Sequence, residues 1–194
     1  MMGRAWVFGD DVDTDQIIAG RYLVKADPRE LARHVMEAID PKFASKVSKG
    51  DVIIAGRNFG CGSSREHAAI ALKAAGVSAI VAESFARIFY RNAINQGLPA
   101  VVCKGIRKHF KSGDIVEVDL EAGEVRNLTT GKTLRFQPMP EFIMRILRAG
   151  GMLPYLRQTI GVRAASHQIK KKEVGATTTE NKKKATVDGP NNNL

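Results

Sequence analysis

The sequence is poor in cysteine and aromatic residues and contains no long apolar run, and each shortage excludes a class of protein. Its two cysteines, Cys61 and Cys103, cannot form a disulfide framework, so we expect a reducing cytoplasm. No run of about 18 apolar residues is present to cross a membrane. The first residues also lack the apolar core of a signal peptide. We therefore predict a cytoplasmic protein with no membrane partner.

The charge of the chain is strongly positive, but other features of a nucleic-acid-binding protein are absent. The 194 residues carry a formal net charge of +10, yet aromatic residues make up only 6% of them. A nucleic-acid interface would combine a focused basic patch with interleaved aromatic residues or a known motif, and no such motif occurs. We therefore expect no nucleic-acid partner and favour a basic protein that handles acidic metabolites.

The composition changes at about residue 163. Residues 163–194 contain seven lysines and arginines against three acidic residues, including two lysine triplets, and few large apolar side chains. Such a segment buries too little apolar surface to offset the entropy of folding. We predict one folded domain over residues 1–162 and a disordered basic tail over residues 163–194. A tail that contacts RNA is an alternative that rests on charge alone.

Short apolar runs alternate with helical patterns in the middle of the chain, as in an α/β protein with parallel strands. The predicted strands lie at residues 52–55, 77–82 and 99–103. The predicted helices between them lie at 68–75 and at 85–96, the second with Ser84 as its N-terminal cap. A strand at 5–8 precedes them, and Asp27-Pro28 begins a helix. Alternating segments at 114–120, 125–128 and 132–136 predict antiparallel strands, followed by helices at 140–149 and 152–160.

The turn at residues 58–67, between a predicted strand and a predicted helix, carries the most chemical information. Its glycines permit a sharp turn and close approach to a ligand. Ser63 and Glu66 have the spacing of a capping box, and a helix N-terminus attracts anions. Arg65 adds a planar fork of donors that suits a carboxylate. An arginine is unfavourable at the positive end of a helix unless an anion lies between them, so we predict a site for an acidic small molecule.

These residues allow several other interpretations. Ser63 alone could be a helix cap, and the turn does not match the Gly-x-Ser-x-Gly pattern of a hydrolase, so no catalytic triad can be established. The two cysteines lack the spacing of a zinc or iron–sulfur site. The loop at residues 11–15 lacks the glycine and glutamate of a calcium-binding EF-hand. Asp15 could orient a neighbouring group of the site or cap its own loop.

Three segments, at residues 11–18, 21–23 and 60–68, together resemble the small subunits of isopropylmalate dehydratases. These proteins are the swivelling-domain members of the aconitase superfamily. The resemblance runs from about residue 3 to residue 160 and excludes the basic tail. It implies an α/β fold of the aconitase swivelling type, a compact domain with three β/β/α layers.

The resemblance also implies a partner and a reaction. A large subunit would carry a 4Fe–4S cluster on three cysteines, and this chain would bind no metal, in a heterodimer or heterotetramer. The reaction would be a hydro-lyase isomerisation of 2-isopropylmalate and 3-isopropylmalate through isopropylmaleate, in leucine biosynthesis. The alternatives are a homoaconitase or methylmalate-type small subunit and, in another class, a non-catalytic binding module whose basic tail contacts RNA.

The family pattern assigns roles to residues of this chain. Ser63 matches the base that removes the proton alpha to a carboxylate, while Ser64 and Arg65 match residues that hold the substrate carboxylate. Asp15 matches an aspartate that supports the site, and Arg21 matches a second carboxylate contact.

The loop after Tyr22-Leu23 faces the variable part of the substrate in this family. Val24, the next residue, is apolar and suits an isopropyl group, whereas a third carboxylate would call for an arginine. Lys25 could still meet a carboxylate, which leaves homoaconitate as an alternative.

Overall fold

The computed structural model describes residues 1–24 and 27–161. The chain divides into two compact units, Met1–Pro154 and Tyr155–Leu194. The predicted basic tail at residues 163–194 lies outside the described residues, as does Lys25. The helix predicted at 152–160 is present over residues 152–161. No helix in the described part of the chain has the length and apolar character to span a membrane.

Seven strands form one sheet in the order β4-β3-β2-β1-β5-β6-β7. The strands are β1 (Met2–Val7), β2 (Val52–Ala55), β3 (Ala79–Ala82), β4 (Ala100–Val102), β5 (Ile115–Asp119), β6 (Glu124–Asn127) and β7 (Lys132–Arg135). Strands β1 to β4 are parallel and β5 to β7 are antiparallel. The sequence predicts these directions for β2 to β4 and for β5 to β7. The first half of β1 pairs with β5 and its second half pairs with β2, so β1 joins the two halves of the sheet.

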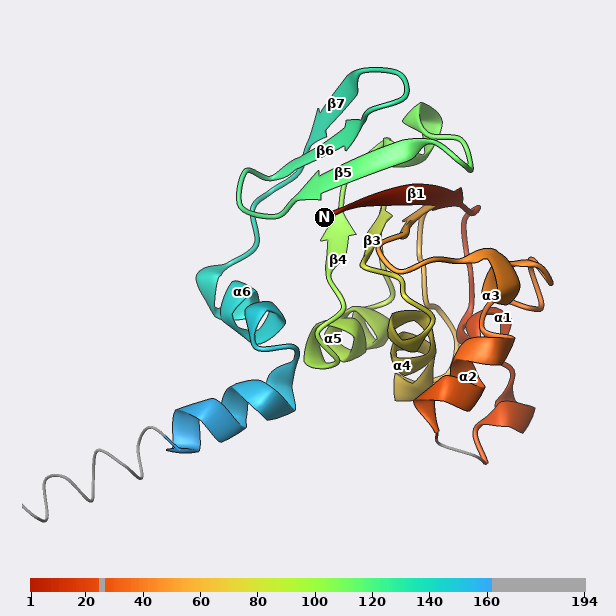
Figure 1. Ribbon diagram of the computed structural model, residues 1–194, viewed down its shortest axis with the longest axis vertical. Helices are drawn as coiled ribbons and strands as arrows, with labels where there is room; N and C mark the ends of the chain where they lie inside the picture. The colour runs from red at the N-terminus through yellow and green to blue at the C-terminus, as the bar shows by residue number, and fades with distance from the viewer. Residues whose placement is uncertain (25–26, 162–194) are drawn as a thin grey trace, which may run out of the picture. The chain divides into compact units, whose positions relative to one another are not determined.

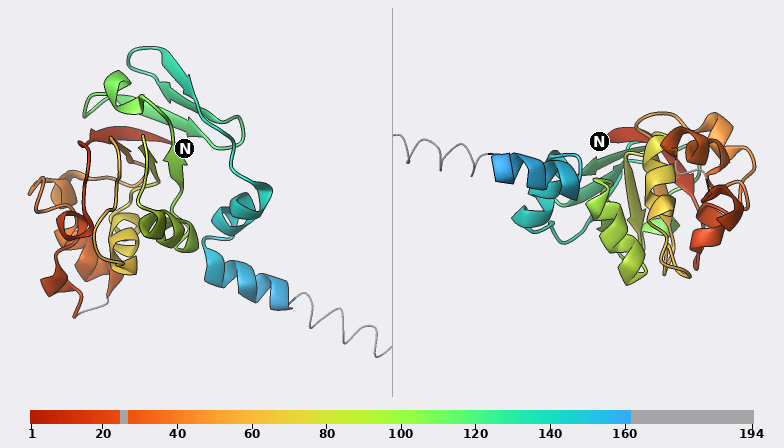
Figure 2. Two further views of the ribbon diagram at one scale, coloured as in Figure 1. Left: turned by 180° about the vertical axis from the view of Figure 1, so that it is seen from behind. Right: turned by 90° about the horizontal axis from the view of Figure 1, so that it is seen from below.

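The helices of the first unit, except α6, lie against one face of the parallel strands, and β5 to β7 lie against the other (Figure 1; Figure 2). Helix α6 lies beside α5. The helices are α1 (Thr14–Ile17), α2 (Pro28–His34), α3 (Phe43–Lys46), α4 (Glu66–Ala74), α5 (Arg87–Asn95) and α6 (Glu141–Arg148), with 3-10 turns η1 (Gly20–Tyr22) and η2 (Ile106–His109).

Alternate side chains of each buried parallel strand enter different cores. Ile53 and Ile80 pack with the helices, in a cluster that includes Leu72. Ile54 packs with the antiparallel strands, in a second cluster that includes Val116. This arrangement confirms the predicted three-layer β/β/α architecture.

Two predicted helix caps are wrong, although both helices are present. Helix α4 begins at Glu66 with Arg65 as its N-cap residue, and no side chain caps it, so Ser63 is not a cap. Helix α5 begins at Arg87 rather than Phe85. The Ser84 hydroxyl accepts a hydrogen bond from the Asn58 backbone N–H at 2.8 Å instead, because the two loops lie side by side. Local capping preference was overridden by a tertiary contact.

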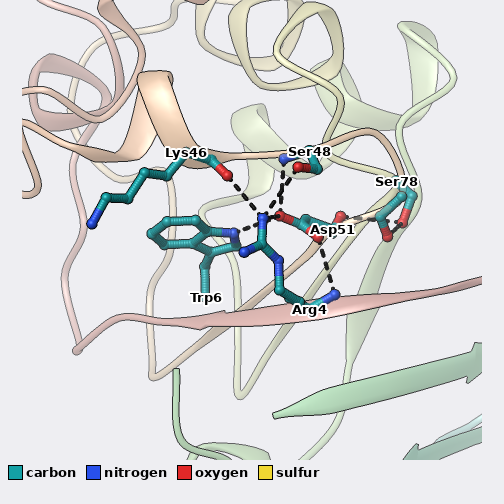
Figure 3. A network of polar contacts seen from close by, with 7 residues as sticks. Arg4, Trp6, Lys46, Ser48, Asp51 and Ser78 are labelled. Carbon is teal, nitrogen blue, oxygen red and sulfur yellow. Dashed lines mark hydrogen bonds and ion pairs between the residues drawn. The ribbon is translucent and has the colours of Figure 1, made fainter. Parts of the chain in front are cut away.

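The buried carboxylate of Asp51, just before β2, is hydrogen-bonded to residues of β1 (Figure 3). The side chain of Asp51 accepts hydrogen bonds from the indole N–H of Trp6 at 2.9 Å and from the backbone N–H groups of Arg4 and Ser48, each at 3.0 Å. Burial alone would raise the pKa of Asp51, but these hydrogen bonds and the charge of Arg4 outweigh it, so its pKa is lowered. A charged Asp51 therefore stabilises the strand pair from which the site loops emerge.

Candidate active site

The glycine-rich turn after β2 lies between the loops that follow β1 and β3. Isolated parallel bridges join Asp13 to Cys61 on one side and Phe59 to Phe85 on the other. The Gly60 N–H donates to the Val12 carbonyl at 2.7 Å. Because β1, β2 and β3 are parallel, their carboxyl ends lie at the same edge of the sheet, where ligands of such sheets bind. The predicted site turn is therefore held from both sides.

Gly60 is required for packing as well as for backbone conformation. Its φ of +78° lies in the left-handed region. A Cβ atom at this position would lie 2.1 Å from Cγ of Phe89, a buried residue of α5. The absence of a side chain at Gly60 thus lets α5 pack directly beneath the turn and brings the first turn of α5 next to Ser63.

The two serines of the turn present exposed hydroxyl groups. The Thr14 hydroxyl donates to the Ser63 carbonyl at 3.1 Å, which fixes the backbone but leaves the Ser63 side chain free. Within the part of the chain that the structure describes, neither the Ser63 nor the Ser64 hydroxyl has a hydrogen-bond partner. Both hydroxyls are thus available to a ligand.

Arg65 and Asp15, which the sequence analysis had both selected, form an ion pair. The Arg65 side chain is only 18% exposed, whereas that of Asp15 is 59% exposed. The Arg65 guanidinium also donates to the Ile18 carbonyl at 3.3 Å. Asp13, not Asp15, caps α1. Of the two roles considered for Asp15, the geometry matches the orientation of a neighbouring charged group.

Arg21 is held by a compact polar cluster, which we call the Glu37 cluster: Arg21, Tyr22, His34 and Glu37. The Glu37 carboxylate accepts from Arg21 at 2.7 Å and from the Tyr22 hydroxyl at 2.6 Å, and lies 3.0 Å from Nδ1 of His34. The Tyr22 and His34 rings are stacked with centroids 3.9 Å apart. Burial would raise the pKa of Glu37, but hydrogen bonds from Tyr22, His34 and Arg21 lower it overall. The Arg21 charge is therefore already paired.

Val24 is 90% exposed and lines an open pocket of about 300 Å³. The other lining residues are Arg21, Tyr22, Glu30 and His34. Ser63 lines a different pocket of about 450 Å³, together with Gly60, Gly62, Ala86, Arg87, Ile88 and Arg91. The two pockets share no lining residue.

Arg87 and Arg91 were missed by the sequence analysis. They lie four residues apart, and therefore on one face of α5, whose first turn contains no acidic residue. The sequence alone shows this spacing and thus indicates two arginines on one helix face. Their place beside Ser63 follows only from the packing of α5 beneath the turn.

Cys61, within the turn, has a thiol whose pKa is raised by burial and by the nearby carboxylates of Asp13 and Asp11. It remains a neutral thiol, and Cys103 is buried. Residues 1–24 and 27–161 contain no group of three or more His, Cys, Asp or Glu side chains placed to hold a metal ion.

Comparison with known proteins identifies relatives of the chain. The family model described as "Aconitase C-terminal domain" matches residues 13–105. The "3-isopropylmalate dehydratase small subunit 1" of Methanopyrus kandleri is 64% identical over 80% of this chain and 92% of its own length. The chain belongs to the family of 3-isopropylmalate dehydratase small subunits.

Other members of the family agree in sequence and structure. The "Isopropylmalate/citramalate isomerase small subunit" of Methanocaldococcus jannaschii is 60% identical over 80% of this chain and 93% of its own length. A crystal structure of 3-isopropylmalate dehydratase from the same organism superposes with a TM-score of 0.81 and 50% identity, covering 85% of this chain and 98% of that one. The resemblance and the fold class predicted from sequence are thus confirmed.

Proposed function

We propose that this chain is the small subunit of a 3-isopropylmalate dehydratase, a hydro-lyase of leucine biosynthesis. The complex interconverts 2-isopropylmalate and 3-isopropylmalate through isopropylmaleate, by dehydration followed by rehydration. The observation that carries this proposal is the turn at residues 63–65, where two free hydroxyls stand next to an arginine oriented by Asp15. The names of the relatives support it. A cytoplasmic location stays a prediction.

In the proposed site, Arg65 and Ser64 bind a carboxylate of the substrate. A guanidinium that is mostly buried and fixed by Asp15 loses little rotamer entropy when it binds an anion. Asp15 also reduces the net charge of Arg65, so binding depends on hydrogen-bond geometry as well as on charge. Asp15 is therefore a positioning residue in this proposal.

Ser63 removes and returns the proton alpha to that carboxylate. A serine hydroxyl is a poor base in water, so its alkoxide needs stabilisation by nearby donors and cations that are fixed in advance. The Ser63 hydroxyl has no partner among the described residues, and its backbone is held by Thr14. An anchored backbone with a free hydroxyl is the arrangement that proton transfer at a fixed substrate carbon requires.

The proposal places the 4Fe–4S cluster on a large subunit, since the relatives are named small subunits. When bound there, the cluster supplies a Lewis acid for the departing hydroxyl. The two thiols of this chain are consistent with a cluster held by the large subunit. Cys103 is buried, and the raised pKa of Cys61 disfavours the thiolate that binds iron. This chain then contributes the carboxylate clamp and the base.

Two features support isopropylmalate over a tricarboxylate. Val24 offers an exposed apolar surface next to the Glu37 cluster. Arg21 shares its charge with Glu37, so it attracts a third carboxylate less strongly than an unpaired arginine would. We propose a positioning role for Arg21 rather than the second carboxylate contact that the resemblance implies, because its partner Glu37 also binds Tyr22 and His34 and holds the cluster together. A methyl-substituted malate is the second candidate substrate, because the M. jannaschii relative is named an isopropylmalate/citramalate isomerase.

The test is to co-express this chain with a cluster-loaded large subunit and to follow the ultraviolet absorbance of the unsaturated intermediate. We expect turnover of isopropylmalate, and the same preparation is compared on citramalate and homoaconitate. Homoaconitate turnover above that of isopropylmalate would contradict the substrate assignment. Absence of turnover on every hydroxy acid, with a large subunit that is active with another small subunit, would contradict the enzyme assignment.

A further inference from the structure

We propose that Arg87 and Arg91 form a second anion-binding subsite beside Ser63, which binds the other carboxylate of a dicarboxylic hydroxy-acid substrate. The inference rests on the proposed function and extends it, because the family pattern assigns substrate contacts only to the turn and to the loop around Arg21. We call the two side chains the α5 arginine pair.

The position of the α5 arginine pair is fixed relative to Ser63 by the backbone. The Phe59 N–H donates to the Ser84 carbonyl and the Ala86 N–H donates to the Phe59 carbonyl, each at 3.0 Å. The segment that enters α5 is therefore bonded directly to the glycine turn. Phe59 and Phe89 pack edge to face with ring centroids 5.3 Å apart. This side-chain contact also holds α5 against the glycine turn.

The charge of the pair is uncompensated within the part of the chain that the structure describes. Arg65, Arg21 and Arg57, by contrast, each have a carboxylate partner. Arg87 and Arg91 are exposed, lie one helical turn apart and repel each other. An anion between them would remove that repulsion, and the pocket of about 450 Å³ that they line has room for one.

A dicarboxylate substrate carries a second negative charge, which this pair would neutralise. Arg65 already shares its charge with Asp15, so the glycine turn alone offers little net positive charge. The α5 arginine pair lines the pocket that contains Ser63, which places positive charge near both the substrate and the proposed alkoxide. Binding of one carboxylate by Arg65 and of the other by the pair would hold the substrate across Ser63.

An alternative role of the pair would be to bind an acidic surface of the large subunit. The pocket favours a small anion, because the pair shares it with Ser63 and with two glycines that add no side chain to it, Gly60 and Gly62. The two uses differ in what their loss would change. Loss of a substrate contact raises KM, whereas loss of a docking contact weakens assembly.

The experiment replaces Arg87 and Arg91 singly by Gln in the full-length chain, co-expressed with its large subunit. We expect each variant to assemble normally and to raise the KM for 3-isopropylmalate about 10-fold or more, since a charge-assisted hydrogen bond is lost. Arg87→Lys and Arg91→Lys should recover part of the loss because they keep the charge. Arg145→Gln is the matched control, since Arg145 is an exposed helical arginine of α6 without a carboxylate partner among the described residues, and should leave KM unchanged.

Three outcomes separate the alternatives. An unchanged KM in both Gln variants would overturn the subsite. Loss of assembly, with a normal KM in the complex that still forms, would also overturn it and assign the pair to subunit docking. A wild-type complex that neither binds 3-isopropylmalate in calorimetry nor turns it over would instead show that the proposed function fails, and the inference that rests on it fails with it.

Discussion

At the scale of single residues, Ser63 combines a fixed backbone with a free hydroxyl. Its carbonyl is held by Thr14, and its side chain is exposed at the edge of a pocket. We predict that Ser63→Ala lowers kcat by about 10²–10⁴-fold, the usual contribution of general acid–base catalysis. Assembly with the large subunit should be unchanged, because no contact of the hydroxyl within the described residues is lost.

The measurement is the rate of formation of the unsaturated intermediate, together with gel filtration of the complex. Ser45→Ala is a matched control, since Ser45 is an exposed serine whose hydroxyl donates to the Lys42 carbonyl in α3, away from the glycine turn. A Ser63→Ala complex with wild-type kcat would remove Ser63 from the role of base.

Site residues that lie within a continuous sequence motif were predictable, and site residues brought together by packing were not. Ser64 and Arg65 lie in one continuous motif, and the Asp15 ion pair joins two motifs that the sequence analysis had both selected. Arg87 and Arg91 lie in an ordinary helix. Tertiary contacts, such as the packing of Phe89 against Gly60, bring that helix to the site. The prediction that Ser84 caps α5 was wrong for the same reason, because the Ser84 hydroxyl accepts a hydrogen bond from the Asn58 backbone N–H instead.

At the scale of secondary-structure elements, the glycine turn and α5 form one packed unit. We predict that Gly60→Ala destabilises the protein by about 2–4 kcal/mol, since it adds the strain of a positive φ to a clash in a full core. The clash is with Phe89, whose Cγ would lie 2.1 Å from the new Cβ. Urea unfolding monitored by circular dichroism measures the change.

The matched control is Gly131→Ala, in the hairpin between β6 and β7. Gly131 has nearly the same φ, +75° against +78°, but a Cβ there would meet no atom within 4 Å. The control therefore carries the backbone strain without the clash, and we expect it to cost about 1 kcal/mol. Equal losses in the two variants would show that packing against α5 is not what requires Gly60.

The hydrogen bonds of Asp51 link another pair of elements, β1 and β2. We predict that Asp51→Asn lowers the free energy of unfolding at neutral pH by about 2–4 kcal/mol, because buried donors lose a charged acceptor. The folded-state pKa of Asp51 is lowered, so its contribution is present above the unfolded pKa and is lost as the pH falls through the folded pKa. The difference between wild type and variant should therefore shrink below about pH 4.

Urea unfolding of both proteins at neutral and acidic pH measures this difference. Glu121→Gln is the control, because Glu121 forms an exposed ion pair with Arg148 at 2.8 Å and its side chain is 74% exposed. Exposed pairs contribute about 0–1 kcal/mol, so this variant should change little. A difference between wild type and Asp51→Asn that stays constant from neutral to acidic pH would contradict the charged state of Asp51.

Most elements were predictable from apolar periodicity, while their pairing was not. The runs at residues 52–55 and 79–82 are short and fully buried, as parallel strands are. Nothing local in β1 indicates that it pairs with β5 through Met2–Arg4 and with β2 through Ala5–Val7. That double pairing depends on partners 47 residues away in β2 and 111 to 115 residues away in β5, and it is what joins the parallel and antiparallel layers.

At the scale of the whole molecule, the proposed site is half of a reaction centre. The loops after β1, β2 and β3 present the proposed carboxylate clamp, a free serine and an arginine pair. The described residues offer no arrangement of ligands for a metal ion. A hydroxyl elimination requires both proton removal and activation of the leaving hydroxyl, and these side chains account for the first. The proposed large subunit accounts for the second.

The basic tail at residues 163–194 is the one long segment to which neither the fold nor the proposed site assigns a role. The match to the M. kandleri relative spans 156 of the 194 residues and already covers 92% of that small subunit. We predict that deletion of residues 163–194 changes kcat and KM of the assembled complex by less than about twofold, because the proposed site contains no residue of this segment. Steady-state kinetics of the truncated and full-length complexes provide the measurement.

The same truncation tests the alternative of a non-catalytic module that contacts RNA. Residues 163–194 hold +4 of the net charge of +10, and phosphate contacts make binding strongly salt-dependent. If the tail binds RNA, the full-length chain should retain a fluorescent single-stranded RNA at low salt, and the truncated chain should lose most of that affinity. A control that replaces the two lysine triplets by glutamine separates charge from length. Loss of turnover on truncation, with RNA binding unchanged, would instead assign the tail to the enzyme complex and contradict its exclusion from the catalytic unit.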